Sequence, residues 1–143
     1  MAVRKGTAVW HGNLREGEGR VRTETGVLDA PYSFTSRFED GEGTNPEELM
    51  GAAHAGCFSM ALSSNLEKEG YTAERISTQD RVFIERVGEG FGITRIEVST
   101  EAVVPGIDDE TFQTLAEGAK NNCPVSKALA AVDMVLHATL KEG

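Results

Sequence analysis

Hydrophobic and polar residues alternate along the first third of the chain with a period of two, which is the pattern of half-buried strands. The segments 7–14, 17–28 and 31–40 each show it, and glycines and charged residues lie between them. In the last segment this period puts Tyr32 and Phe34 on one face and Arg37 on the other. We therefore expect Arg37 to project away from the aromatic side chains.

The pattern changes at residues 45–62, which read NPEELMGAAHAGCFSMAL and have almost no polar face. Asn45 is a good helix N-cap and a proline follows at the first helical position, so a helix should start here. Glu48 completes a capping box with Asn45, which leaves Glu47 without a structural task. The helix should end near Glu69, just before a glycine. A helix that is apolar nearly all round has to be covered on nearly all sides.

Strand patterns return after this helix and are followed by further helices. Residues 75–88 and 92–105 predict a hairpin with a rather long glycine-containing turn, and residues 132–140 predict a last strand. Residues 106–122 have helical spacing after aspartate caps, and residues 123–131 predict a short helix that starts at a proline. This order of elements indicates an α+β fold rather than βαβ winding, in a single domain of residues 1–143.

Composition narrows the class of function. Hydrophobic residues make up 39% and charged residues 26% of the 143 residues, which suits a globular protein with its own core. The formal net charge of −9 argues against nucleic-acid binding, because the phosphate backbone requires a basic surface. No stretch has the length of a membrane span and the first residues show no secretory signal, so we expect a cytoplasmic protein without membrane partners.

The two cysteines, Cys57 and Cys123, are the residues best able to carry chemistry. In a reducing compartment they would not form a permanent disulfide, so any pairing between them would be transient and chemical. Cys123 precedes Pro124 and so sits at a helix N-cap, where the helix dipole favours a thiolate. Cys57 lies in mid-helix and would need activation, either by His54 three residues earlier or by Arg37 from elsewhere.

Simpler interpretations of the same residues stay open. Two cysteines in a chain of this size are more often inert core residues than a redox pair. His54 could be a buried histidine with satisfied polar atoms, and Arg37 could form a surface ion pair with Glu39 or Asp40. A zinc site made from both cysteines and a histidine is a further option, but no ligand spacing typical of zinc supports it.

Two motifs resemble those of a known family, and this resemblance favours reactive over inert cysteines. The stretch GTNPEELMGAAHAGCFSMAL and the later NNCPVSKAL resemble the osmotically inducible protein C (OsmC) family, which is related to the organic hydroperoxide resistance (Ohr) proteins. The resemblance spans nearly the whole chain, from Gly6 to Leu140, and AAHAGCFSM is nearer to OsmC proper. It implies an α+β fold with antiparallel sheets around a long buried central helix, a second helix and an intertwined dimer.

The resemblance also implies an activity, the thiol-dependent reduction of organic hydroperoxides without a cofactor or a metal. Carried over by position, Cys57 would be the peroxidatic cysteine and Cys123 the resolving one, and Arg37 and Glu47 would complete the site. The hydroperoxide would oxidise Cys57 to a sulfenic acid, and Cys123 would form a disulfide with it. A dithiol reductant, lipoyl or thioredoxin-like, would then reset the pair.

Helix geometry sets a condition on such a site. Ten residues of straight helix rise about 15 Å, so Glu47 would not reach Cys57 of its own chain along that helix. Either the helix breaks at Gly51 or Glu47 comes from a second chain, which favours a homodimer with active sites at the interface. Apolar side chains near the site would favour organic hydroperoxides over hydrogen peroxide; the candidates are Phe34, Phe58 and Met60.

A different class of function stays open beside this one. A binding module would use the apolar pocket around the helix to hold a lipid-like or thiol-bearing small molecule, with Cys57 merely packed. Which of the two thiols attacks first is open as well. Cys123 is better placed at a helix N-terminus, whereas Cys57 is favoured only by the match to the family. Replacement of either cysteine separates a peroxidase from a binder, since a binder would barely respond.

Overall fold

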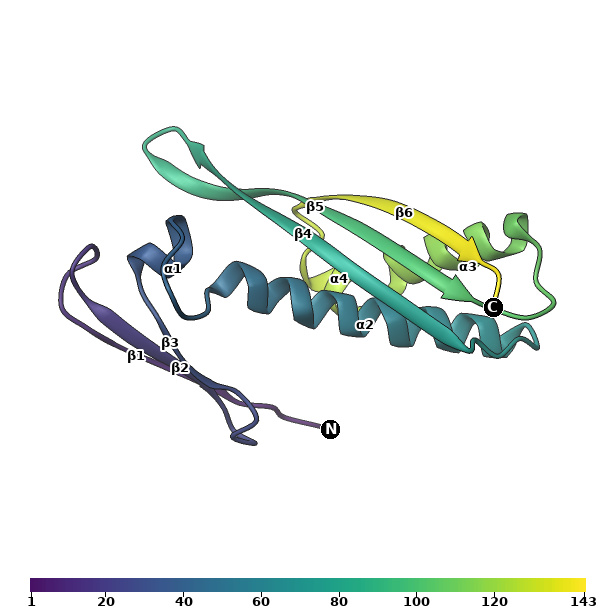
Figure 1. Cartoon of the computed structure of the whole chain (residues 1–143), viewed down its shortest axis with the longest axis horizontal. Helices are drawn as coiled ribbons and strands as arrows, with labels where there is room; N and C mark the ends of the chain where they lie inside the picture. The colour runs from purple at the N-terminus through teal and green to yellow at the C-terminus, as the bar shows by residue number, and fades with distance from the viewer. The chain divides into compact units, whose positions relative to one another are not determined.

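The computed structural model describes all 143 residues, which form two compact units, Met1–Leu49 and Met50–Gly143. The first unit holds a three-stranded antiparallel sheet in the order β1-β2-β3, followed by a short helix (Figure 1). Its elements are β1 (Gly6–His11), β2 (Glu18–Thr23), β3 (Asp29–Tyr32) and α1 (Phe34–Phe38).

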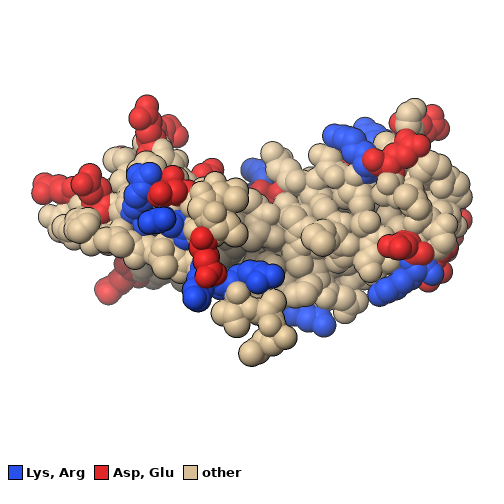
Figure 2. Space-filling view, turned by 90° about the horizontal axis from the view of Figure 1, so that it is seen from below, with Lys and Arg blue, Asp and Glu red and all other residues tan.

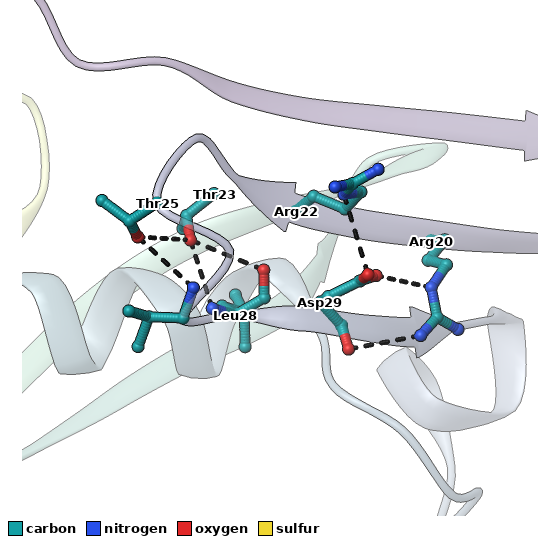
Figure 3. Close-up of polar contacts among 7 residues, drawn as sticks. Arg20, Arg22, Thr23, Thr25, Leu28 and Asp29 are labelled. Atoms are coloured by element: carbon teal, nitrogen blue, oxygen red, sulfur yellow. Dashed lines mark hydrogen bonds and ion pairs between the residues drawn. The ribbon is translucent and has the colours of Figure 1, made fainter.

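The turn between β2 and β3 is closed by its own polar side chains (Figure 3). The hydroxyl of Thr23 accepts from the backbone N–H of Leu28 at 3.1 Å, and it also contacts the hydroxyl of Thr25. Beside this turn, Asp29 pairs with two arginines of β2, Arg20 and Arg22. These contacts are local and exposed, so they hold the hairpin and do not form a buried site.

The segment after β3 is helical, whereas the alternating pattern predicted a strand as far as residue 40. Ser33 caps this helix: its hydroxyl accepts from the backbone N–H of Ser36 at 3.2 Å, and the Ser36 hydroxyl accepts from the backbone N–H of Ser33 at 2.8 Å. Such a capping box satisfies two backbone N–H donors and so favours a helix. The alternation of hydrophobic and polar residues, which spans only a few positions here, favours a strand less strongly. Helical spacing puts the Arg37 guanidinium 5.2 Å from the ring centroid of Phe38, so the predicted separation of Arg37 from the aromatic side chains is wrong.

The long helix α2 (Pro46–Lys68) starts at the predicted cap and ends one residue before the predicted end. The side-chain oxygen of Asn45 accepts from the backbone N–H of Glu48 at 2.7 Å. The Glu48 carboxylate accepts from the hydroxyl of Thr44 at 2.8 Å, so this side chain braces the turn before the helix. The Asn45 half of the predicted capping box is confirmed, whereas the Glu48 side chain bonds Thr44 rather than the backbone of Asn45. Glu48 still has a structural task, and Glu47 is left for another partner.

The second unit contains a three-stranded sheet in the order β4-β5-β6 (Figure 1). β4 (Arg75–Val87) and β5 (Gly90–Val103) form the predicted hairpin, but only two residues join them instead of the longer turn expected. β6 (Asp133–Lys141) pairs parallel with β5, so the expectation of purely antiparallel sheets is wrong for this pair. The reason is the crossover through α3 (Asp109–Asn122) and α4 (Pro124–Ala128), which returns the chain to the start of β5.

The core of the second unit lies where α2 and α3 pack against the sheet. Its fully buried side chains come from α2, β5 and α3; among them are Phe58, Leu62, Leu66, Ile96, Val98, Ala102, Phe112, Ala116 and Ala119. Phe58 belongs to this core, whereas the neighbouring residue Cys57 is only partly buried. None of the helices combines the length and the apolar character that crossing a membrane requires.

Candidate active site

Arg37 and Glu47 form an ion pair in the first unit. Nε of Arg37 donates to both carboxylate oxygens of Glu47, at 3.0 and 3.3 Å, and Nη2 donates to Oε1 at 2.7 Å. Glu47 is 5% exposed, so a buried carboxylate holds the partly exposed guanidinium through several hydrogen bonds. Two of the three guanidinium nitrogens bond Glu47, which leaves Nη1 to meet another ligand.

An apolar pocket of about 250 Å³ adjoins Arg37 in the same unit. Besides Arg37, its lining residues are Trp10, Leu14, Tyr32, Ser33, Phe34 and Phe38. An apolar cavity with one fixed cation suits a ligand with a hydrocarbon part and a polar end. Of the three apolar residues predicted near the site, Phe34 lines this pocket, whereas Phe58 lies in the core of the second unit and Met60 is 77% exposed.

Cys57 and Cys123 are neighbours in the second unit, and both are free thiols. Cys57 projects from the middle of α2 and is partly exposed, whereas Cys123 caps α4 and is 1% exposed. Each thiol acts on the ionisation of the other, and the backbone N–H of Val125 also acts on that of Cys57. The fold therefore brings together two cysteines that lie far apart in the sequence, and only one of them is open to a ligand.

The surroundings act in opposite directions on the two thiols. Burial raises the pKa of Cys57, the Val125 N–H lowers it, and the hydrogen bond and charge of Cys123 raise it, so that the pKa lies above its usual value. Burial also acts to raise the pKa of Cys123, but the hydroxyl and backbone N–H of Ser126, the Cys57 thiol and the charge of His54 outweigh it and lower this pKa. Cys123 is therefore the thiol of the pair that ionises more readily, and Cys57 needs a further cation to ionise.

His54 is connected to Cys123 through other side chains. Its Nδ1 bonds the carboxylate of Asp80, and its Nε2 lies 2.8 Å from Oγ of Ser126. Oγ of Ser126 lies in turn 3.1 Å from Sγ of Cys123. The option that His54 activates Cys57 directly is therefore not what the geometry offers, because both ring nitrogens already have other partners.

Asp80 and Ser126 were not among the residues predicted for the site. A signal for Asp80 exists: it occupies an inward position of β4, between Thr78 and Val82, where a carboxylate is unusual. Ser126 stands three residues after Cys123, where its backbone N–H bonds the capping sulfur at 3.2 Å. Its link to His54 depends on tertiary packing, which local sequence does not reveal.

Comparison with known proteins places this geometry in a family. The sequence model described as "OsmC-like protein" matches residues 39–137, a range that holds Glu47, Cys57 and Cys123. The chain is 51% identical to "Peroxiredoxin OsmC" of Escherichia coli (strain K12) over 129 residues, and this alignment covers 90% of each of the two chains. It is 35% identical to the "Organic hydroperoxide resistance protein" of Xanthomonas axonopodis pv. citri (strain 306) over 118 residues, and this alignment covers 78% of each of the two chains.

Solved structures agree with the sequence comparison. An organic hydroperoxide resistance protein OsmC from Legionella pneumophila matches with a TM-score of 0.72 and 26% identity, over 97% of this chain and 99% of that one. The OsmC-like protein VCA0330 from Vibrio cholerae has a TM-score of 0.76 at 15% identity, which shows the fold alone. The α+β fold class is thereby confirmed. Since the family match and the relatives both cover most of the sequence, the chain belongs to the family of OsmC-like proteins.

Proposed function

We propose that this protein is a thiol-dependent peroxidase that reduces organic hydroperoxides to alcohols. The observation that carries the proposal is that the partly exposed thiol of Cys57 and the buried thiol of Cys123 lie close enough for each to act on the ionisation of the other. Two relatives carry names that point to the same chemistry, a peroxiredoxin and an organic hydroperoxide resistance protein. The electrons and atoms of the reaction balance with these two thiols, the hydroperoxide and a reductant.

Cys57 reacts first in this proposal because it is the accessible thiol. Its thiolate attacks the distal oxygen of R–O–O–H, the O–O bond breaks, and the alkoxide takes up a proton and leaves as the alcohol. Cys57 is then a sulfenic acid. Cys123 attacks that sulfur, the S–S bond forms, and hydroxide leaves and is protonated to water. A dithiol, lipoyl or thioredoxin-like, reduces the disulfide by exchange.

Arg37 supplies the cation that Cys57 lacks. The pKa of Cys57 is raised by burial and by Cys123, so its thiolate requires an additional positive charge. Glu47 holds the Arg37 fork through Nε and Nη2. In the assembled site, Nη1 would be the nitrogen that meets the thiolate and the peroxide oxygen. The apolar pocket beside Arg37 would take the organic part of the substrate, and hydrogen peroxide would gain nothing from it.

Two chains build each site in this proposal. α2 continues through Gly51 without a break, so about 15 Å of helix separates Glu47 from Cys57 of the same chain. Figure 2 looks from below onto the side of the second unit on which α2 lies, and the surface there is mostly uncharged. The exposed residues of α2 include Ala52, Ala53, Gly56 and Met60, which suit a covered rather than a solvated face. We infer a homodimer in which Arg37 and Glu47 of one chain meet the cysteines of the other.

The proposal is tested by the consumption of cumene hydroperoxide with a dithiol, in wild type, Cys57→Ser and Cys123→Ser. We expect turnover in wild type alone and a titratable sulfenic acid on Cys57 in the Cys123→Ser protein. Equal turnover of hydrogen peroxide would contradict the role of the apolar pocket. Background consumption in all three proteins would overturn the peroxidase and favour a binding module.

A further inference from the structure

We propose that Asp80, His54 and Ser126 form a proton relay that takes the thiol proton of Cys123 when this cysteine resolves the sulfenic acid at Cys57. The inference rests on the proposed function, because only a peroxidase of this type needs Cys123 as a nucleophile. It assigns a role to three buried groups that the first step of the reaction does not use. It also explains how a cysteine removed from solvent loses its proton.

The four groups form an unbroken chain of short contacts across three elements. Asp80 on β4 bonds Nδ1 of His54 on α2, and Nε2 of His54 lies 2.8 Å from the hydroxyl oxygen of Ser126 on α4. That oxygen lies 3.1 Å from Sγ of Cys123. The side chains of His54 and Asp80 are 0% exposed, so water does not compete for these contacts. This order of carboxylate, imidazole and hydroxyl is the arrangement that moves a proton away from a nucleophile.

The carboxylate of Asp80 has no other polar partner. Its Oδ2 bonds His54, whereas its Oδ1 is buried without a hydrogen bond. A buried carboxylate with an unpaired oxygen is costly, and a structural contact alone would not require one. Its charge is useful in one circumstance, when His54 is an imidazolium. Asp80 therefore stabilises the protonated state of the relay and fixes the ring with Nε2 toward Ser126.

The proton step balances within these groups. In the resting state the Cys123 S–H donates to Oγ of Ser126, the Ser126 O–H donates to Nε2 of His54, and the Nδ1–H of His54 donates to Asp80. When Cys123 attacks, its proton moves to Ser126, whose own proton moves to His54. The S–S bond to Cys57 forms, the S–O bond of the sulfenic acid breaks, and the leaving hydroxide takes up a proton as water. The imidazolium of His54 then loses its proton, and the relay is reset.

Few other charges face this chain. Cys57 on α2 is the remaining titratable group that acts on it, since its thiol also lowers the pKa of Cys123. A surface pocket of about 380 Å³, which Ser126 lines, carries three further charged groups: Lys120 on α3, Lys127 on α4 and Asp133 at the start of β6. Lys120 pairs with Glu117 at 3.0 Å. Cys57 does not line this pocket, which gives Ser126 a route to solvent by which the proton can leave.

The first experiment measures the ionisation of Cys123 without any peroxide. In the Cys57→Ser protein, Cys123 is the remaining thiol, and its thiolate absorbance is followed against pH. We expect the pKa of Cys123 to rise toward the ordinary value of 9.0 when His54→Gln is added. The exposed His137 on β6 gives the matched control, and His137→Gln should leave the titration unchanged. An unchanged titration in folded His54→Gln protein would overturn the relay.

A second set of variants separates a relay from the bare charge of His54. Ser126→Ala removes the bridging hydroxyl and leaves the imidazole in place, and we expect it to raise the pKa of Cys123 as well. Ser126→Thr keeps a hydroxyl, so the pKa of Cys123 should stay lowered as it is with Ser126. A Ser126→Ala protein that titrates like its parent would refute the bridge. A reciprocal measurement avoids buried substitutions: by NMR, Cys123→Ala should lower the pKa of His54 and leave His11 and His137 unaffected.

The third measurement follows the resolving step itself. After one equivalent of cumene hydroperoxide, we expect formation of the disulfide in His54→Gln to be at least about tenfold slower than in wild type near neutral pH, with oxidation of Cys57 unchanged. Equal rates of disulfide formation would reject the relay and leave the peroxidase intact. If no sulfenic acid forms in either protein, the proposed function fails, while the thiol titrations still decide whether the three groups act on Cys123.

Discussion

Arg37 is the residue whose replacement best tests how the accessible thiol is activated. Arg37→Lys keeps the positive charge but loses the fork that bonds both oxygens of Glu47. We expect kcat/KM for an organic hydroperoxide to fall roughly 10- to 100-fold, because the cation is no longer aimed at the thiolate. The control is Arg81→Lys, which changes an exposed pair with Glu97 on the sheet. Comparable activity in the two variants would contradict the role of the fork.

The His54–Asp80 pair predicts a pH dependence of stability. Burial acts to lower the pKa of His54, but the hydrogen bond and charge of Asp80 and the charge of Cys123 outweigh it and raise the pKa above 6.5. A group with a raised folded-state pKa contributes stability that is complete below the unfolded-state value and disappears as the pH rises through the folded-state value. The free energy of unfolding should therefore fall as the pH increases from 6.5 through the folded-state pKa of His54.

Denaturant titrations across this pH range check the prediction, in a Cys123→Ser background so that the thiol does not contribute. Asp80→Asn removes the charge that raises the pKa of His54, so the slope should flatten. His137→Gln replaces an exposed histidine and should leave the slope as it is. A slope that survives Asp80→Asn would show that another group carries the pH dependence.

The same residues show how far the sequence predicts a site. Both cysteines, Arg37 and Glu47 could be named in advance because a motif marks them. Asp80 lies on a strand with no motif around it, and the alternation of its neighbours was its one signal. The lowered pKa predicted for Cys123 at the start of α4 is confirmed, and the hydroxyl of Ser126 lowers it together with the backbone N–H that the capping sulfur accepts.

Among the elements, the end of α2 offers a clean test of backbone conformation. Gly70 has a φ of +88°, and a Cβ placed there would meet nothing within 4 Å, so any cost of Gly70→Ala is conformational. We expect a loss of about 1–2 kcal/mol in the free energy of unfolding. Gly118→Ala in the interior of α3, where the Cβ would lie 3.5 Å from the Asn65 side chain, should instead gain about 0.5–1 kcal/mol. Changes of the same sign in both variants would refute this account.

Elements with a strong local signal were predicted and those fixed by tertiary pairing were not. α2, α3 and the hairpin of β4 and β5 follow from caps and periodicity. α1 was missed because two serine hydroxyls, rather than an apolar stripe, start the helix. The parallel pairing of β6 with β5 depends on the path of the chain through α3 and α4, and the alternation within β6 fits either direction.

For the whole molecule, the main structural question is which chain completes each site. Unit Met1–Leu49 contains the Arg37–Glu47 pair and the apolar pocket, and unit Met50–Gly143 contains both cysteines and the relay. In the proposed mechanism neither half acts alone, because Arg37 requires a thiolate to stabilise and Cys57 requires a cation. A division of this kind allows two defective chains to repair each other if the halves come from different chains.

Complementation between two inactive variants tests this directly. Arg37→Met lacks the cation and Cys57→Ser lacks the nucleophile, so neither homodimer should turn over. Unfolded together and refolded at equal amounts, half of the dimers should be mixed, and each mixed dimer should hold one site with a native Arg37 and a native Cys57. We expect roughly a quarter of the wild-type rate, since one site in four is complete under random pairing in a two-fold dimer. If each chain built its own site, no mixed dimer would contain a complete one, and the refolded mixture would stay inactive while wild type treated in the same way recovers its activity.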